Sequence, residues 1–508
     1  MLAKVFSFGL LGLDAYPITI EVDVGKGLPA MSIVGLPDSA VRESKERVRA
    51  AIRNSGHTFP SARITVNLAP ADIKKEGPSF DLAIALGILS ATEQVPEGAL
   101  RQYAVLGELS LSGQIKPVTG ILSATLAMKD EPFAGILVPA SNTHEAALAG
   151  TTPVFGFRHL NDIVRFLNDP TAYQAVTDNR PASQPKTGSD VDFSDVKGQI
   201  HAKRGLEIAA AGNHNALLIG PPGSGKTMLA RRFPTILPNM TQDEALTVTK
   251  IHSAAGYLKS TPTLLLERPF RTPHHSASNI ALVGGGADPR PGEVTLAHNG
   301  VLFLDELPEF QRSVIEGLRQ PLEDGEVTIA RASKTLRFPA RFALLTAMNP
   351  CLCGHLNDRQ KPCRCSPAAV HKYMAKISGP LLDRIDIHLH VPALQTAELF
   401  SAPAGEGSEA IRARVMNARA RQTARFGKAA ITANAQMTQQ HLRAHCALNA
   451  ACRSMLKDAV EALGLSARGH DKVLKVARTI SDLTECEEIK PEHLAEAIGY
   501  RCLDKINN

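Results

Sequence analysis

The sequence predicts an α/β protein in which a parallel sheet lies between a mixed α+β region and a helical region. Alternating apolar and polar residues in ITIEVDV and RITVNLAP are typical of half-buried strands. The short apolar runs ALLIG, VLFLDE and FALLTAMN are typical of parallel strands that are buried on both faces. The Ala-, Arg- and Leu-rich sequence after residue 410 has a helical period.

The length of 508 residues predicts about three domains. The stretch TDNRPASQPKTGSD is rich in Pro, Ser, Thr and charge, and SAPAGEGSE is a weaker case, so each is interpreted as a linker. The predicted boundaries are a first domain at 1–176, a linker at 177–192, a second domain at 193–395, a linker at 396–410 and a helical domain at 411–508.

Composition excludes several classes of protein. With 44% hydrophobic and 21% charged residues, the chain is expected to fold rather than remain disordered. Only 5% of residues are aromatic, which argues against base stacking as the main means of holding nucleic acid. The net charge of +6 is compatible with a polyanionic partner. No run approaches the roughly 18 apolar residues of a membrane span. Eight cysteines without a secretion signal indicate the cytoplasm.

A glycine-rich loop predicts a phosphate site. GPPGSGKT follows the apolar run NALLIG and precedes a helical stretch, which is the context that a P-loop requires. Lys226 is expected to reach the β- and γ-phosphates of ATP, and the Thr227 hydroxyl to bind Mg²⁺. The remaining predicted contacts to nucleotide in this loop are Gly220, Pro221, Pro222, Gly223, Ser224 and Gly225.

Two later strands end in polar residues that suit hydrolysis. VLFLDE delivers Asp305, a candidate Mg²⁺ ligand, and Glu306, a candidate base for the attacking water. FALLTAMNP ends in Asn349, which could position that water, although an Asn before Pro is equally suited to a turn.

Four cysteines lie within a short segment directly after Asn349. CLCGHLNDRQKPCRC places Cys351, Cys353, Cys363 and Cys365 in a C-x-C…C-x-C pattern. Thiolates favour tetrahedral Zn²⁺, so the segment predicts a structural zinc site. Free cytosolic thiols and a redox-labile pair remain alternatives.

The P-loop, the acidic strand, the strand ending in Asn349 and the segment SGPLLDRIDIHLHVP together resemble AAA+ ATPases of the magnesium chelatase-like type, in particular the YifB/ComM family. The resemblance covers essentially the whole chain. It implies a hexameric ring in which Arg384 acts as an arginine finger in the neighbouring subunit's site. It also places Arg468 nearest the nucleotide, with Arg478 as the second choice.

Two further segments of the central domain have basic or metal-binding character. The segment at 268–300 resembles the chelatase-type insertion. Its neighbouring His274 and His275 are more readily explained by a mobile insertion that faces the central pore of a ring than by a metal site. The stretch at 327–342 is interpreted as a hairpin that, in a ring, could project inward and grip phosphates, and a solvated charged hairpin is the alternative. Its basic residues are Arg331, Lys334, Arg337 and Arg341.

The first domain resembles Lon-type Ser-Lys proteases. KKEGPSFDLAIALGIL places Ser79 at the position of the nucleophile, but TGILSATLA places Leu122 where the catalytic lysine belongs. A serine without a base is not activated. We therefore expect a Lon-like fold without peptidase activity.

The family resemblance implies an ATP-driven motor that moves branched or single-stranded DNA, with branch migration during natural transformation as the specific role. The alternative is a chelatase-type or other AAA+ remodeller of metal sites or proteins. The Lon-like domain ahead of the motor argues against a dedicated chelatase.

Overall fold

The computed structural model describes residues 1–129, 131–176, 191–258, 264–286, 289–331, 334–356, 358, 361–393, 405–427 and 431–501. The chain forms two compact units. Unit 1 holds residues 1–183 and 242–265, and unit 2 holds residues 184–241 and 266–508. Most of each predicted linker lies outside the described residues, which omit 177–190 and 394–404.

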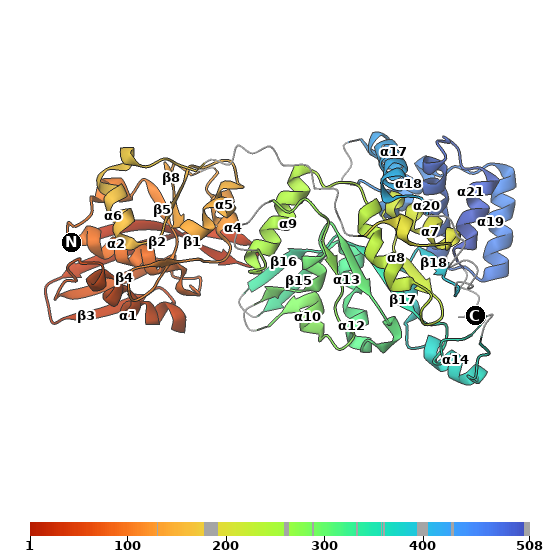
Figure 1. Ribbon diagram of the computed structural model, residues 1–508, viewed down its shortest axis with the longest axis horizontal. Helices are drawn as coiled ribbons and strands as arrows, with labels where there is room; N and C mark the ends of the chain where they lie inside the picture. Colours follow the sequence, from red (N-terminus) through yellow and green to blue (C-terminus); the bar gives the residue numbers. More distant parts are fainter. Residues whose placement is uncertain are drawn as a thin grey trace. The chain divides into compact units, whose positions relative to one another are not determined.

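Unit 1 is built on a seven-stranded sheet in the order β3-β4-β2-β1-β5-β8-β9 (Figure 1). β1 and β2 pair antiparallel across a turn at Gly12, whose φ of 65° favours glycine. β5, β8 and β9 follow in parallel. The strands are β1 (Leu2–Leu11), β2 (Asp14–Gly25), β3 (Ala30–Val34), β4 (Arg63–Ala69), β5 (Tyr103–Val105), β8 (Gly135–Pro139) and β9 (Val154–Phe157), with a separate ribbon of β6 (Glu108–Leu109) and β7 (Ile115–Lys116).

Helices complete the core of unit 1. α2 is buried along its whole length because its sequence, DLAIALGILSA, has apolar residues on every face and only two polar ones, Asp81 and Ser90. The helix α9 lies within the range predicted for the central domain, yet it belongs to unit 1. The helices are α1 (Ser39–Asn54), α2 (Asp81–Ala91), α3 (Glu97–Leu100), α4 (Ile121–Ala127), α5 (Thr143–Ala147), α6 (Leu160–Asn168) and α9 (Gln242–Ala254).

Unit 2 contains the predicted parallel sheet, in the order β11-β14-β17-β10-β18. Every neighbouring pair is parallel. β10, β14 and β17 are fully buried, which confirms the interpretation of the three apolar runs. The strands are β10 (Ala216–Ile219), β11 (Phe270–Arg271), β14 (Val301–Leu304), β17 (Ala343–Met348) and β18 (Ile387–His390), and two ribbons pair β12 (Gly284–Gly285) with β13 (Arg290–Pro291) and β15 (Glu326–Arg331) with β16 (Lys334–Pro339).

The helices of unit 2 include a C-terminal group, drawn in blue in Figure 1, whose apolar faces share one core with the parallel sheet. This group consists of α17 (Ser408–Phe426), α18 (Gln439–His445), α19 (Ala450–Leu463), α20 (Ala467–Leu483) and α21 (Pro491–Gly499). The other helices are α7 (Ile200–Gly212), α8 (Lys226–Arg232), α10 (Asn279–Val283), α11 (Glu293–Leu296), α12 (Arg312–Gly317), α13 (Arg319–Asp324), α14 (Pro367–Met374) and α15 (Gly379–Leu382). The α/β fold with a helical C-terminal region is therefore confirmed.

Candidate nucleotide site

The sheet register brings three polar strand ends to one edge. β17 lies between β10 and β14 and pairs in parallel with both. Ile219 at the end of β10 is level with Met348 at the end of β17. The residues that follow these strands therefore meet at the carboxyl edge of the sheet, where open α/β sheets bind ligands.

The glycine-rich loop leaves β10 at this edge and has the geometry of an anion cradle. Gly223 and Gly225 have φ values of 75° and 94°, which residues with side chains rarely adopt. A Cβ atom at either glycine would meet no heavy atom within 4 Å. The Ser224 hydroxyl is buried and has no hydrogen-bond partner among the described residues. Open space beside a buried hydroxyl suits bound phosphate oxygens.

Lys226 lies at the centre of the cradle. Its ammonium donates to the carbonyls of Gly220 and Pro221 at 2.7 and 2.9 Å, and to Oδ1 of Asn349 at 3.2 Å. Burial lowers its pKa, and the charges of Asp305 and Glu306 oppose that shift. Residues of the glycine-rich loop and residues that follow β14 and β17 thus surround this one cation.

Thr227 and Asp305 form the oxygen pair that a hard cation would need. The Thr227 hydroxyl donates to Oδ2 of Asp305 at 2.7 Å. A hydroxyl and a carboxylate are oxygen ligands of the kind that Mg²⁺ prefers. The two groups therefore fit the metal of an ATP–Mg²⁺ complex.

Glu306 follows Asp305 in a backbone conformation that is unusual for a residue with a side chain. Its φ is 53°, and its carboxylate is 59% exposed. Nδ1 of His275 lies 3.5 Å from Oε2 of Glu306. This contact has no signal in the sequence, because nothing in the spacing links a histidine in the insertion to the end of β14. The ring of His274 packs against that of His275 at a centroid distance of 4.0 Å.

The three predicted arginines have different surroundings. Arg384 forms an ion pair with Glu323 of α13 and donates to the Pro380 carbonyl at 2.5 Å. Arg468 is exposed near the start of α20. Arg478 is buried, where it binds Oδ1 of Asp482 at 3.0 Å and the Cys486 carbonyl at 2.9 Å. The internal bonds of Arg478 therefore favour a structural role over a nucleotide contact.

The four cysteines after Asn349 form one group, which we call the thiol cluster. Its members are Cys351, Cys353, Cys363 and Cys365. All four sulfurs lie within 4.8 Å of one another. The backbone N–H groups of Arg364 and His355 lower the pKa of Cys353 to about 6. The pKa of Cys363, by contrast, is raised to about 11, so what marks the cluster as a candidate metal site is the spacing of its four sulfurs.

In unit 1, Leu122 lies where the resemblance to Lon-type proteases predicts a catalytic lysine, and its backbone is held by a hydrogen bond within the core. Ser79 lies in a short 3-10 turn, Pro78–Phe80, and Leu122 is fully buried in α4. The backbone N–H of Leu122 donates to Oε1 of buried Glu145 at 3.1 Å, and Glu145 also accepts from Ser253 of α9. An apolar side chain in this setting offers no base for Ser79.

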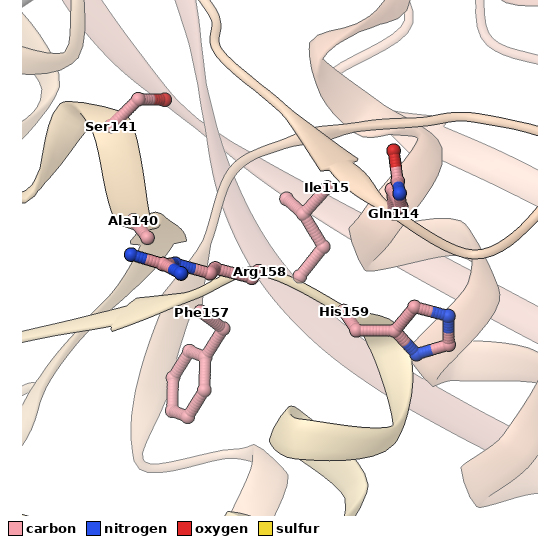
Figure 2. A pocket seen from close by; sticks show the side chains of 7 residues that line it. All are labelled: Gln114, Ile115, Ala140, Ser141, Phe157, Arg158 and His159. Carbon is pink, nitrogen blue, oxygen red and sulfur yellow. The ribbon is translucent and has the colours of Figure 1, made fainter.

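Unit 1 also has a cavity of about 510 Å³ beside β7 and β9. Figure 2 shows the Arg158 side chain extending toward Ala140 and the His159 ring, which also lines the cavity, pointing the opposite way. His159 accepts from the backbone N–H of Asn161 at the start of α6, and its second ring nitrogen lies 2.9 Å from the Ser112 carbonyl. Both ring nitrogens therefore serve local structure.

Comparisons with known proteins agree with this arrangement. Residues 192–399 match the family described as magnesium chelatase, subunit ChlI. Residues 20–142 match subunit ChlI of Mg-chelatase, and residues 405–501 match the C-terminal part of that subunit. The chain is 43% identical to the competence protein ComM of Haemophilus influenzae, over 99% of this chain and 98% of the relative. The chain belongs to the YifB/ComM family of magnesium chelatase-like AAA+ proteins.

Two further relatives support the family and the fold. The uncharacterized protein YifB of Escherichia coli is 43% identical over 99% of this chain and 98% of its own length. A Lon protease of Aquifex aeolicus is 27% identical over 25% of this chain and 16% of its own length. Among the described residues, no helix has the length and apolar character that crossing a membrane requires.

Proposed function

We propose that this member of the YifB/ComM family hydrolyses ATP with the site between β10, β14 and β17. The observation that carries the proposal is the convergence of Lys226, Asn349 and the Thr227–Asp305 pair on one edge of the sheet. A cation, a metal-binding oxygen pair and a neutral amide beside an open glycine cradle are what phosphoryl transfer requires. The cofactors of the proposed activity are ATP and Mg²⁺, and the thiol cluster adds a candidate Zn²⁺ site.

Each side chain has a distinct proposed role. Lys226 binds the β- and γ-phosphates, and Thr227 and Asp305 hold Mg²⁺, which neutralises phosphate charge when it is bound. Glu306 orients the attacking water and accepts its proton, and Asn349 fixes the position of that water. Arg468 is the proposed nucleotide contact from the helical region.

We further propose that subunits assemble into a hexameric ring in which Arg384 reaches the neighbour's γ-phosphate. A guanidinium stabilises negative charge that spreads over the transferring phosphoryl group. In the single chain Arg384 is paired with Glu323. Assembly would exchange that ion pair for the phosphate, so a subunit alone would hydrolyse ATP slowly.

The proposed substrate of the motor is DNA, and the specific role is branch migration during natural transformation. The full-length similarity to a protein named for competence supports this role. The hairpin β15–β16 supports a DNA contact, because it carries Arg337, whose side chain is 73% exposed. Residues 332–333 at its tip lie outside the described part of the chain.

The deciding experiment is ATP-dependent movement of a synthetic three-strand or four-way DNA junction by the full-length protein. Product should appear with ATP and be absent with the Lys226→Ala variant. Stimulation of phosphate release by DNA, measured in parallel, tests whether ATP hydrolysis is coupled to DNA binding. The motor proposal would be contradicted if the protein remains monomeric with ATP and releases phosphate at the same rate with and without DNA.

A chelatase-type activity is the second candidate, because all three matched family models are those of a magnesium chelatase subunit. The Mg-chelatase 38 kDa subunit of Cereibacter sphaeroides is 26% identical over only 31% of this chain, however. ATP-dependent insertion of Mg²⁺ into a porphyrin in a reconstituted assay would favour this candidate over the DNA motor.

A further inference from the structure

Three sulfurs of the thiol cluster have the spacing that a single tetrahedral metal ion imposes, and the fourth, that of Cys365, lies within 4.8 Å of the others. The distances from Cys351 to Cys353 and Cys363 are 3.4 and 3.7 Å, and that between Cys353 and Cys363 is 3.6 Å. Zinc–sulfur bonds of about 2.3 Å in a tetrahedron separate the sulfurs by about 3.8 Å. A disulfide would require about 2.05 Å, so these thiols are not paired covalently.

The backbone of the cluster also contacts one of its sulfurs. The N–H of Cys365 donates to the sulfur of Cys363 at 3.4 Å. The cluster offers four ligands, which matches closed structural zinc sites. Sulfurs this close surround one ion, whereas an iron–sulfur cluster separates its thiolates by its own iron and sulfide atoms.

The loop that carries the cluster touches the phosphate-binding loop directly. A Cβ atom placed on Gly354 would lie 2.5 Å from Cδ and 2.8 Å from Cγ of Pro222. The φ of Gly354 is 80°, and its N–H donates to the Cys351 carbonyl at 3.0 Å. The backbone at Gly354 is therefore folded into a turn and packed on the proline ring of GPPGSGKT.

The same segment is connected at both ends to residues of the nucleotide site. It begins directly after Asn349, whose amide contacts Lys226. It ends at Ser366, the N-cap of α14. The backbone N–H of Asn349 lies close enough to the Tyr373 hydroxyl of α14 to offset part of the rise that burial causes in the pKa of that hydroxyl. A loop with so little apolar content needs a cross-link to hold this shape.

We infer that the thiol cluster binds one Zn²⁺ and that this metal positions the phosphate-binding loop for nucleotide through the contact of Gly354 with Pro222. The second half of the inference rests on the proposed ATP site, whereas the metal site stands on its own geometry. The ion holds the cysteine segment folded, and the folded segment supports the proline side of the cradle. Preorganisation of this kind lowers the ordering cost of binding.

Elemental analysis of full-length protein, purified without a chelator and without a polyhistidine tag, tests the metal. About one zinc per chain is expected in the wild type and in Cys486→Ser, a free thiol outside the cluster. Cys365→Ser should lose the zinc. Absence of zinc from the wild type, iron in its place, or full zinc retention by Cys365→Ser would overturn the assignment.

The positioning role is tested by a variant that keeps all four ligands. Gly354→Ala should retain its zinc and bind a fluorescent ATP analogue about fivefold or more weakly, because the added methyl group displaces Pro222. Gly150→Ala is the matched control, since Gly150 also has a positive φ, 65°, and its N–H also donates to a carbonyl three residues earlier, but its Cβ would meet nothing within 4 Å. Affinity equal to the wild type in zinc-loaded Gly354→Ala would overturn the positioning role, even where Cys365→Ser fails to fold.

Failure of the inference can be told apart from failure of the proposed function. If Lys226→Ala binds the analogue as well as the wild type does, the nucleotide site is misplaced, and the zinc content still decides the metal. If Lys226→Ala abolishes binding of the analogue while Gly354→Ala binds it as the wild type does, the proposed ATP site is supported and the positioning role is contradicted.

Discussion

The Nζ atom of Lys226 lies 3.2 Å from Oδ1 of Asn349, which joins the glycine-rich loop to the end of the neighbouring strand. Replacement of Lys226 by Ala removes the only side-chain cation found within the described cradle and should abolish nucleotide binding. Fluorescent ATP titration measures this. Lys376→Ala is the control, because that lysine is exposed and pairs with Glu309 at 3.2 Å. An equal loss of ATP binding in both variants would indicate that the protein unfolds.

Glu306→Gln separates binding from hydrolysis. The amide keeps the size of the side chain but cannot accept a proton, so ATP should bind normally while turnover falls about 10²–10⁴-fold. Phosphate release and nucleotide titration, run on the same preparation, measure the two effects. Glu309→Gln, a nearby exposed acid, should turn over at the wild-type rate. Normal turnover in Glu306→Gln would contradict its assignment as the base.

Arg384→Ala should lose ATPase activity and regain part of it in mixed rings with Glu306→Gln subunits. In such rings an Arg384→Ala subunit keeps its own Glu306 and receives an intact arginine from its neighbour. The steady-state rate as a function of mixing ratio measures the rescue. A rate that never exceeds the sum of the two separate variants would place the arginine in its own subunit's site.

Glu323→Gln provides the matched test of Arg384. Glu323 contacts Arg384 within the chain. If that ion pair only holds the arginine before assembly, Glu323→Gln should keep the wild-type rate at saturating subunit concentration. Loss as severe as in Arg384→Ala would show that the pair itself is needed for activity.

Arg337→Ala tests the proposed DNA contact of the hairpin. Arg337 is exposed and lies 3.6 Å from Glu326, a distance at which a surface ion pair contributes little. Its loss should weaken DNA binding at all sequences and reduce the slope of log affinity against log salt by about one. Arg101→Ala, an exposed arginine of unit 1, is the control. If the slope of log affinity against log salt is unchanged, Arg337 does not contact DNA phosphates.

The strands and the loop at the candidate site could be predicted because their signals are local. Short apolar runs that end in polar residues identify β10, β14 and β17, and parallel pairing brings those ends together without further information. Asn349 was ambiguous on local grounds. Its contact with Lys226 depends on the strand order, which no local pattern contains.

The contacts that could not be predicted join residues far apart in the chain. The packing of Gly354 on Pro222 and the ion pair of Arg384 with Glu323 have no local signature. The membership of α9 in unit 1 depends on the buried Glu145, which accepts from Ser253, and on the Lys250–Asp14 pair at 2.7 Å. These depend on tertiary packing, which overrides sequence proximity.

A buried charge network in unit 2 predicts sensitivity to acid. Asp386 forms an ion pair with Lys472 at 2.7 Å and contacts Nδ1 of His214 at 3.1 Å. The pKa of Asp386 is held well below its ordinary value; burial opposes this, but the charge of Lys472 and the contact with His214 outweigh it. Burial also lowers the pKa of His214, so the folded state keeps that ring neutral.

Both pKa shifts lower the free energy of unfolding as pH falls. The unfolded chain protonates His214 below about pH 6.5 and Asp386 below about pH 4, while the folded chain resists both reactions, so the unfolded state binds more protons. The free energy of unfolding of unit 2 should therefore decrease from pH 7 to pH 4. Asp386→Asn leaves Lys472 buried without its counter-ion, which should cost about 3–5 kcal/mol at pH 7 and flatten the acid dependence. Asp458→Asn, an exposed acid on α19, should have the wild-type profile in chemical denaturation. A profile for Asp386→Asn that parallels the wild type across this range would show that the network does not set the acid sensitivity.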